Sequence, residues 1–231
     1  MTMNIMLPLI VLMTALSLPL SSQTAKPKFS IEHRKAEPAK GSIISDGVWK
    51  KVAVKQTFHA PWSKLDDDTR FQCYLSDNYF YFKFRVNDST LTLKRPFGKK
   101  LDVAREDRVE IFLSATAGMS VYYCLETDPD GHTLDYKAEY CRKFDYGWSF
   151  STLETETSKA PDLKSYIVAG RLSTAEMKRL GIDTDKFYMG IFRADFDTPR
   201  RVVWYSLLPV YRKKADFHRP EMLFEATSHR K

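Results

Sequence analysis

The sequence feature that most constrains the fold is the two-residue alternation of residues 79–88. Apolar side chains occupy every second position, Phe80, Phe82, Phe84 and Val86. Tyrosines and polar or cationic side chains occupy the positions between them, Tyr79, Tyr81, Lys83, Arg85 and Asn87. A period of two predicts a β-strand with one face in a core, and with its other face toward solvent or a ligand groove.

Similar segments recur along the chain at hairpin spacing. The predicted strands are 29–33, 70–75, 79–88, 107–115, 119–127, 132–140, 148–157, 166–172, 187–196, 201–207 and 222–226. Ser173 and Glu176 form a capping box and Gly181 suits a C-cap, so the one predicted helix is Thr174–Leu180. We therefore expect an all-β fold, an antiparallel β-sandwich of two sheets (jelly-roll or immunoglobulin-like) with one short helix.

The N-terminus is typical of an export signal. Residues 1–25 contain no Asp, Glu, Lys or Arg, and the apolar run 5–20 is followed by small and polar residues. This run is short for a membrane span and has the length of a signal-peptide core. We expect residues 1–25 to be cleaved, residues 26–42 to lead into one domain at 43–231, and the mature protein to be secreted or periplasmic.

The formal charge is +7, and the cationic residues occur in short pairs interleaved with acids. A nucleic-acid-binding protein more often concentrates them in one stripe, so we expect no nucleic-acid partner. A solvated basic surface and an anionic polysaccharide partner both remain open interpretations.

The three cysteines lack the Cys-x-x-Cys spacing of a zinc site. Cys73 and Cys124 lie in apolar strand patterns and are predicted to be buried. Cys141, beside Arg142 and Lys143, is predicted to be accessible.

Residues 216–221, Asp-Phe-His-Arg-Pro-Glu, combine an aromatic ring, an imidazole, a guanidinium and two carboxylates. Pro220 lacks a backbone N–H and restricts Arg219, which favours an extended loop. Such a loop suits a polyhydroxylated ligand, because sugar C–H groups stack on an aromatic ring while hydroxyls bind Arg and carboxylates. The alternative interpretation is a polar turn before the last strand.

Several motifs in order resemble the family 9 carbohydrate-binding modules, in particular their stand-alone, exported branch in polysaccharide-degrading bacteria. The motifs are Asp46-Gly47-x-Trp49, Phe84-Arg85-Val86-x-Asp88, Asp107-Arg108-Val109-Glu110-Ile111-Phe112-Leu113, Tyr122-Tyr123-Cys124-Leu125-Glu126 with Gly131, and Trp204, Pro209 and residues 216–221. The resemblance covers about Ile43 to Ala226. It implies a β-sandwich that binds an oligosaccharide or polysaccharide without cleaving it, and in some members structural calcium.

The resemblance also implies a site. Two tryptophans sandwich the end sugar in xylanase-linked members, and the matching positions here are Ala104 and Phe217. Tyr123 matches a polar sugar-contacting position. The candidate sugar-binding residues are Phe217, His218, Arg219, Glu221, Glu126, Tyr123, Arg85, Glu110 and Trp204. Glu110 and Arg85 could equally form surface ion pairs, and Trp204 could equally belong to the core.

Two other function classes remain open, and no cofactor is predicted. An exported haem-binding sandwich would need axial ligands, for which the candidates are His59, His132, His218 and Met189. A glycoside hydrolase would need two carboxylates across a cleft, for which Asp107, Glu110 and Glu126 are candidates. Two acidic clusters, Asp128/Asp130 with Gly131 and residues 66–68, resemble incomplete calcium loops.

Overall fold

The computed structural model describes residues 25–61, 65–198, 200–210 and 213–229, and the predicted signal peptide, apart from Ala25, lies outside them. The strands are β1 (Lys28–His33), β2 (Lys55–His59), β3 (Asp66–Leu75), β4 (Tyr79–Asn87), β5 (Arg108–Ser114), β6 (Val121–Thr127), β7 (Thr133–Glu139), β8 (Lys143–Asp145), β9 (Glu154–Lys159), β10 (Ser165–Ser173), β11 (Lys186–Thr198), β12 (Arg201–Ser206) and β13 (Phe224–His229). The helical elements are α1 (Thr174–Arg179) and the 3-10 turns η1 (Gly47–Lys51), η2 (Lys100–Arg105) and η3 (Pro220–Met222). The all-β prediction is confirmed. No helix in these ranges is long and apolar enough to cross a membrane.

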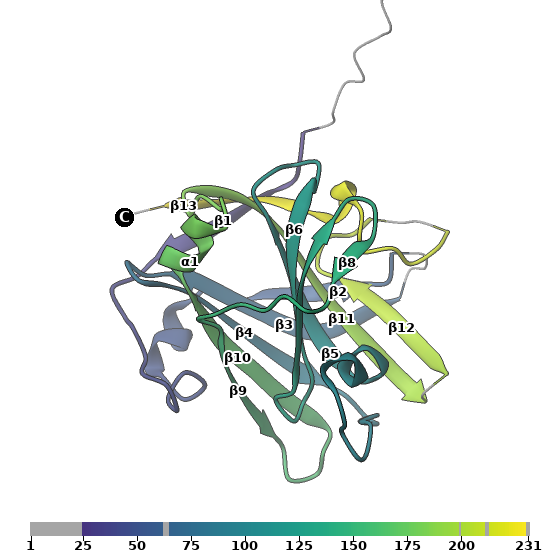
Figure 1. The fold of residues 1–231 in the computed structure, drawn as a ribbon. Helices are drawn as coiled ribbons and strands as arrows, with labels where there is room; N and C mark the ends of the chain where they lie inside the picture. Colours follow the sequence, from purple (N-terminus) through teal and green to yellow (C-terminus); the bar gives the residue numbers. More distant parts are fainter. Residues whose placement is uncertain (1–24, 62–64, 199, 211–212, 230–231) are drawn as a thin grey trace, which may run out of the picture.

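The strands form two layers around a shared core (Figure 1). One layer runs β2-β3-β4-β10-β9 and the other runs β8-β7-β6-β5-β11-β12. The apolar face predicted for residues 79–88 lies in this core, where Phe80 of β4 meets the ring of Phe187 of β11 edge-on at 6.1 Å. The inner positions of β5, Val109, Ile111 and Leu113, belong to the same cluster.

The prediction of two antiparallel sheets holds only in part, because hydrogen bonds join the layers along both sides. On one side β12 pairs with β2, and on the other β1 lies parallel to both β13 and β3. The six strands β11, β12, β2, β3, β1 and β13 therefore close a mixed barrel, and the other strands extend it. The segment 26–42 contributes to this closure, since Phe29 and Ile31 of β1 are core residues.

The predicted helix is present as α1. The Ser173 hydroxyl accepts a hydrogen bond from the Glu176 backbone N–H, which is one half of the predicted capping box, and Gly181 follows the helix with φ at 79°. The other half is absent, because the Ser173 backbone N–H bonds the Thr152 hydroxyl. The Glu176 carboxylate also accepts hydrogen bonds from the backbone of Ser151 and Thr152. The helix therefore holds the loop before β9 against the core.

Each layer is also covered on part of its outer face. Trp49 of η1 packs on Tyr74, which stacks on Tyr81 at 4.7 Å, so this part of the tyrosine-bearing face of β4 is buried. On the other layer, a second apolar cluster covers β5, β6, β7 and β11. It includes Phe112, Tyr122, Cys124, Leu134, Tyr136, Phe192, Phe217, Met222 and Leu223. The loop before β13 therefore lies on the outer face of this sheet.

The cysteine predictions are confirmed. Cys73 and Cys124 are buried, Cys141 is exposed, and all three thiols are free. Burial raises the pKa of both buried thiols.

Candidate functional site

A buried arginine with two glutamates lies on the outer face of β5 and β6. The alternation of β5 places Arg108 and Glu110 on one face, and Glu110 lies opposite Glu126 in the β5–β6 register. The Arg108 Nε lies 2.6 Å from Glu126 Oε2, and its Nη2 lies 2.9 Å from Glu110 Oε1. We call these three residues the Arg108 cluster.

The two glutamates of the Arg108 cluster are in different protonation environments. Burial, reinforced by the nearby Glu126 carboxylate, raises the pKa of Glu110 to about 8. Glu110 Oε1 is also not aligned to accept a hydrogen bond, despite its closeness to Arg108. Glu126, in contrast, accepts hydrogen bonds from Arg108 and from the Tyr136 hydroxyl at 2.7 Å. At neutral pH Glu110 is therefore a carboxylic acid that can donate a hydrogen bond to a ligand oxygen, beside the hydrogen-bonded Arg108 and Glu126 side chains.

Two aromatic rings adjoin the cluster with different exposure. Trp204 of β12 is half-buried, and the Arg108 guanidinium lies 5.1 Å from its ring centre. Phe217 is 5 % exposed, stacks on Phe192 at 4.1 Å, and meets Trp204 edge-on at 5.6 Å. Because one face of Phe217 is covered by Phe192, the partly exposed ring beside the cluster is Trp204.

The loop carrying residues 216–221 is held by packing and by ion pairs. Phe217, Met222 and Leu223 are buried in the outer apolar cluster. Asp216 bonds Arg142 at 2.5 Å and Arg219 at 2.6 Å. Burial opposes ionisation of Asp216, but these hydrogen bonds outweigh it and lower its pKa.

His218 is a packing residue of the same loop. Its ring stacks on Phe112 at 4.9 Å, and its Nδ1 is hydrogen-bonded to the Tyr122 hydroxyl at 3.0 Å. Burial, aided by Arg142, lowers its pKa to about 3, so the imidazole is neutral at physiological pH.

These side chains enclose a cavity of about 170 Å³. Its lining residues are Arg108, Glu110, Glu126, Arg142, Trp204, Ala215, Asp216, Phe217 and His218. The structure thus brings together five of the nine predicted site residues, Glu110, Glu126, Trp204, Phe217 and His218. We call this cavity the Arg108 pocket.

Four predicted residues do not line the Arg108 pocket. Tyr123 faces the inner core, packed on Trp148 and Phe150, because it has the opposite parity to Glu126 on β6. Arg85 is exposed on β4 in the other layer, opposite Arg70 of β3. Glu221 is exposed in η3, and Arg219 reaches the pocket only through Asp216. The prediction grouped these four residues with Glu126, whereas the structure places none of them in the wall of this pocket.

Four lining residues were missed by the sequence reasoning, Ala215 and three residues with charged side chains. Arg108 shares the parity of Glu110, so the alternation of β5 could have identified it. Asp216 lies within the 216–221 motif but was not selected. Arg142 reaches the pocket from a loop 74 residues away from its partner Asp216, and no local pattern signals that contact.

Comparison of the folds finds similar proteins, whereas comparison of the sequences finds none. No family model matches the chain, and no curated protein matches its sequence. A candidate carbohydrate-binding protein from Bacteroides uniformis superposes with a TM-score of 0.72 at 13% identity, covering 89% of this chain and 100% of that one. A family 9 carbohydrate-binding module from Caldicellulosiruptor kristjanssonii superposes at 15% identity over 88% of this chain. Its complex with glucose gives a TM-score of 0.57 over 97% of the module, and its complex with cellotriose gives 0.59 over 95%. This chain has the fold of the family 9 carbohydrate-binding modules.

The two predicted stacking positions of the family 9 site are changed in this chain. Ala104 lies in η2, half-buried against the outer apolar cluster, and supplies no ring. Phe217 is present but packed on Phe192. Trp204, the third aromatic candidate, is the ring beside the Arg108 cluster.

Neither of the two acidic clusters that resemble incomplete calcium loops gathers its carboxylate oxygens around one point. In the 66–68 cluster, Asp66 contacts His59, Asp67 contacts Arg193, and Asp68 contacts Asn87. Asp130 contacts Arg95 and Lys159 rather than joining Asp128. Calcium takes six to eight oxygen ligands, so neither cluster fits it.

Two other groups of potential metal ligands converge within the described residues. In each group the ligand atoms lie within 4.8 Å of one another: Glu106 with Asp128 and His132, and Asp88 with Asp107 and Asp195. Arg193 already neutralises the second group, with Nη2 at 2.8 Å from Asp88 and 3.2 Å from Asp195. The first group forms no ion pair with a Lys or Arg among the described residues. Burial, together with the nearby Asp128 carboxyl group, raises the pKa of Glu106 to about 7.

The four candidate haem ligands do not converge. Met189 is in the inner core, and His218 bonds Tyr122 on the outer face. His59 is paired with Asp66, and His132 with Asp128.

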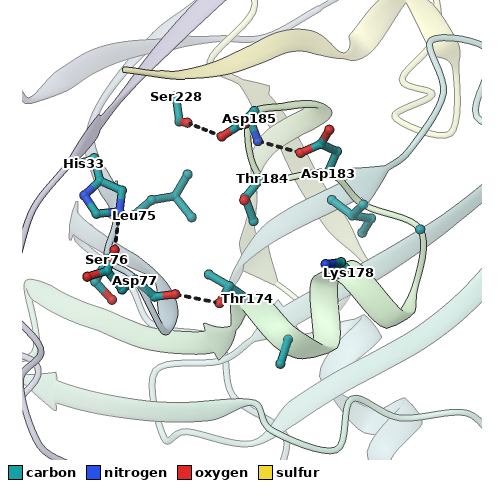
Figure 2. A pocket seen from close by; sticks show the side chains of 13 residues that line it. His33, Leu75, Ser76, Asp77, Thr174, Lys178, Asp183, Thr184, Asp185 and Ser228 are labelled. Carbon is teal, nitrogen blue, oxygen red and sulfur yellow. Dashed lines mark hydrogen bonds and ion pairs between the residues drawn. The ribbon is translucent and has the colours of Figure 1, made fainter. Parts of the chain in front are cut away.

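A second and larger cavity, of about 550 Å³, lies between α1, the turn after β3 and the end of β13 (Figure 2). Figure 2 shows His33 beside Asp77, and Asp185 bonded to Ser228. No Phe, Tyr or Trp is among the residues that line it. It therefore offers no ring on which a sugar can stack.

Proposed function

We propose that this chain is an exported, non-catalytic carbohydrate-binding protein that takes a saccharide in the Arg108 pocket and acts in polysaccharide capture or breakdown. The observation that carries the proposal is the half-buried Trp204 ring placed against the Arg108 cluster in one cavity. The family 9 fold supports the same function, since solved modules of that fold are complexes with glucose and cellotriose.

The chemistry of the pocket matches a pyranose. The Trp204 ring offers a face to the sugar C–H groups, as aromatic platforms do. The Arg108 guanidinium donates to ring or hydroxyl oxygens, and Glu126 accepts from hydroxyls. Protonated Glu110 adds a further donor, so the wall presents both donors and acceptors to the hydroxyl rim.

The size of the pocket limits the ligand. A volume of about 170 Å³ is below the roughly 300–1,000 Å³ of pockets for drug-sized ligands. One terminal sugar unit fits, with the rest of an oligosaccharide projecting into solvent. With one stacking ring, we expect a Kd closer to millimolar than to micromolar.

The test is a glycan array with the mature protein, followed by calorimetry on the best soluble oligosaccharide. Trp204→Ala should weaken binding by about 10- to 100-fold, because stacking contributes about 1–3 kcal/mol. Trp148→Ala is the matched control, since Trp148 is also half-buried but packs on Tyr123 at 5.0 Å, away from the pocket. If Trp204→Ala binds like the wild type, or Trp148→Ala loses binding equally, the site is misplaced.

The carboxylate pair also tests the non-catalytic part of the proposal. Glu110 and Glu126 contact one guanidinium from the same wall of the pocket, whereas glycosidases place two carboxyl groups on either side of the scissile bond. We expect no release of reducing sugar from a polysaccharide panel. Release that disappears in Glu126→Gln would instead identify a glycoside hydrolase.

A further inference from the structure

We propose that Glu106, Asp128 and His132 form a binding site for a divalent transition metal of the zinc type. Glu106 precedes β5, while Asp128 and His132 flank the turn between β6 and β7. Their ligand atoms all lie within 4.8 Å of one another. Ligands at about 2.0–2.2 Å from zinc lie within about 4.4 Å of each other, so small side-chain adjustments bring the three to one ion.

An unpartnered buried carboxylate points to the missing cation. Glu106 is 0% exposed, and neither of its carboxylate oxygens accepts an aligned hydrogen bond. Asp128, also 0% exposed, accepts hydrogen bonds from the backbone N–H groups of Asp130 and His132 through one oxygen. Buried acids are ordinarily paired with a cation or coordinate a metal. Among the described residues, no Lys or Arg forms an ion pair with Glu106.

The donor set selects the class of metal. His132 Nδ1 is hydrogen-bonded to Asp128 Oδ2 at 2.8 Å, and a metal held by these two atoms would take the place of this hydrogen bond. An imidazole with carboxylates suits zinc and its transition-metal neighbours, whereas calcium takes oxygen ligands alone. The site therefore differs from the structural calcium that the family 9 resemblance implies.

The surroundings of the site are already ordered. The His132 ring stacks on Phe97 at 3.7 Å with an interplanar angle of 6°, which fixes its orientation. Asp130 is held by Arg95 and Lys159 and adds no further ligand. Three protein ligands leave a fourth tetrahedral position for water, and the 34% exposed His132 side chain marks the route from solvent.

The experiment titrates untagged, chelator-treated mature protein with Zn²⁺ by calorimetry and by thermal melts. We expect one zinc per chain and a rise in Tm, while Ca²⁺ at equal concentration produces no comparable rise. His132→Ala should weaken zinc binding by at least tenfold. His59→Ala is the matched control, because His59 also pairs with an aspartate, Asp66. Among the described residues no third potential ligand joins that pair, so the His59→Ala variant should bind zinc like the wild type.

Glu106→Gln separates a metal site from a structural role. The substitution removes the repulsion between the Glu106 and Asp128 carboxyl groups, so the metal-free variant should melt at or above the wild-type Tm while losing the zinc-induced rise. A wild type that takes no zinc would overturn the proposal. So would a zinc response that survives in both Glu106→Gln and His132→Ala, or calcium that binds as well as zinc.

Discussion

Two buried arginines on neighbouring strands of the same sheet have different surroundings. Arg193 of β11 faces inward and contacts three carboxylates, Asp67 at 2.6 Å, Asp88 at 2.8 Å and Asp195 at 3.2 Å. Arg108 of β5 faces outward, contacts two, and lines a cavity. Arg108 lies opposite Ala194, the residue after Arg193, so strand parity alone sends them to opposite faces.

The difference shows that a buried arginine paired with carboxylates can either join distant strands of the fold or line a cavity. The partners of Arg193 come from β3, from the end of β4 and from β11, so its ion pairs tie the two layers together. The partners of Arg108 come from β5 and β6, which are already hydrogen-bonded to each other. Arg108 therefore adds little to the assembly of the fold. The side of its guanidinium that faces away from the glutamates lines the Arg108 pocket.

The largest expected effect is at Arg193. Arg193→Met leaves three carboxylates without their cation, and breaking a buried ion pair in this way costs about 3–5 kcal/mol. Arg108→Met should cost less, because Tyr136 still donates to Glu126 and Glu110 is protonated at neutral pH. Urea denaturation of the two variants measures both costs. An equal or larger cost at Arg108 would contradict the contrast.

A second prediction concerns Phe217, which was expected to be a sugar platform. Because its ring is buried against Phe192, Phe217→Ala should lower the free energy of unfolding by about 3 kcal/mol, within the range for buried Phe→Ala substitutions. Trp204→Ala, at a half-buried ring, should cost clearly less. The same denaturation series gives both values. A Phe217→Ala variant of wild-type stability that has lost sugar binding would restore the original assignment.

The third prediction concerns the pH dependence of stability that comes from Glu110, which is a slope rather than a single cost. Its pKa is raised to about 8 in the folded protein, so the folded state binds this proton more tightly than the unfolded state does. The contribution of Glu110 to the free energy of unfolding is fully present below the pKa that Glu110 has in the unfolded chain, and it is lost as the pH rises toward about 8. Glu110→Gln should therefore remove a decline of at most about 1.4 kcal/mol per pH unit.

Three other acids, Glu106, Asp107 and Asp195, also have raised pKa values and contribute to the change of the unfolding free energy with pH. The effect of Glu110 is therefore measured as the difference between the wild type and Glu110→Gln. The free energy of unfolding of wild type and Glu110→Gln should converge at pH 5 and separate by pH 8, with the variant more stable at pH 8. Parallel curves would show that Glu110 is ionised throughout.

Local pattern was sufficient for most strands and their faces, although β2 and β8 were not predicted and β9 begins six residues later than expected. The alternation of residues 79–88 predicted β4 and its core face, and the Ser173–Glu176 capping box predicted α1. The same parity placed Glu110 on the face opposite Val109 and Ile111. It also separates Tyr123 from Glu126, although the sequence prediction grouped them. These features depend on neighbours a few residues apart, which the chain carries locally.

The sequence by itself therefore determined the all-β class, the inward and outward faces of most strands, and the donors and acceptors available for a sugar. Only the tertiary structure decided that β1 closes the barrel beside β13, and that Phe217 is buried while Trp204 stays partly open. It also decided that Arg142 meets Asp216, and that Glu106 meets His132. Each of these outcomes joins segments distant along the chain, and burial of a side chain depends on what the rest of the fold places over it.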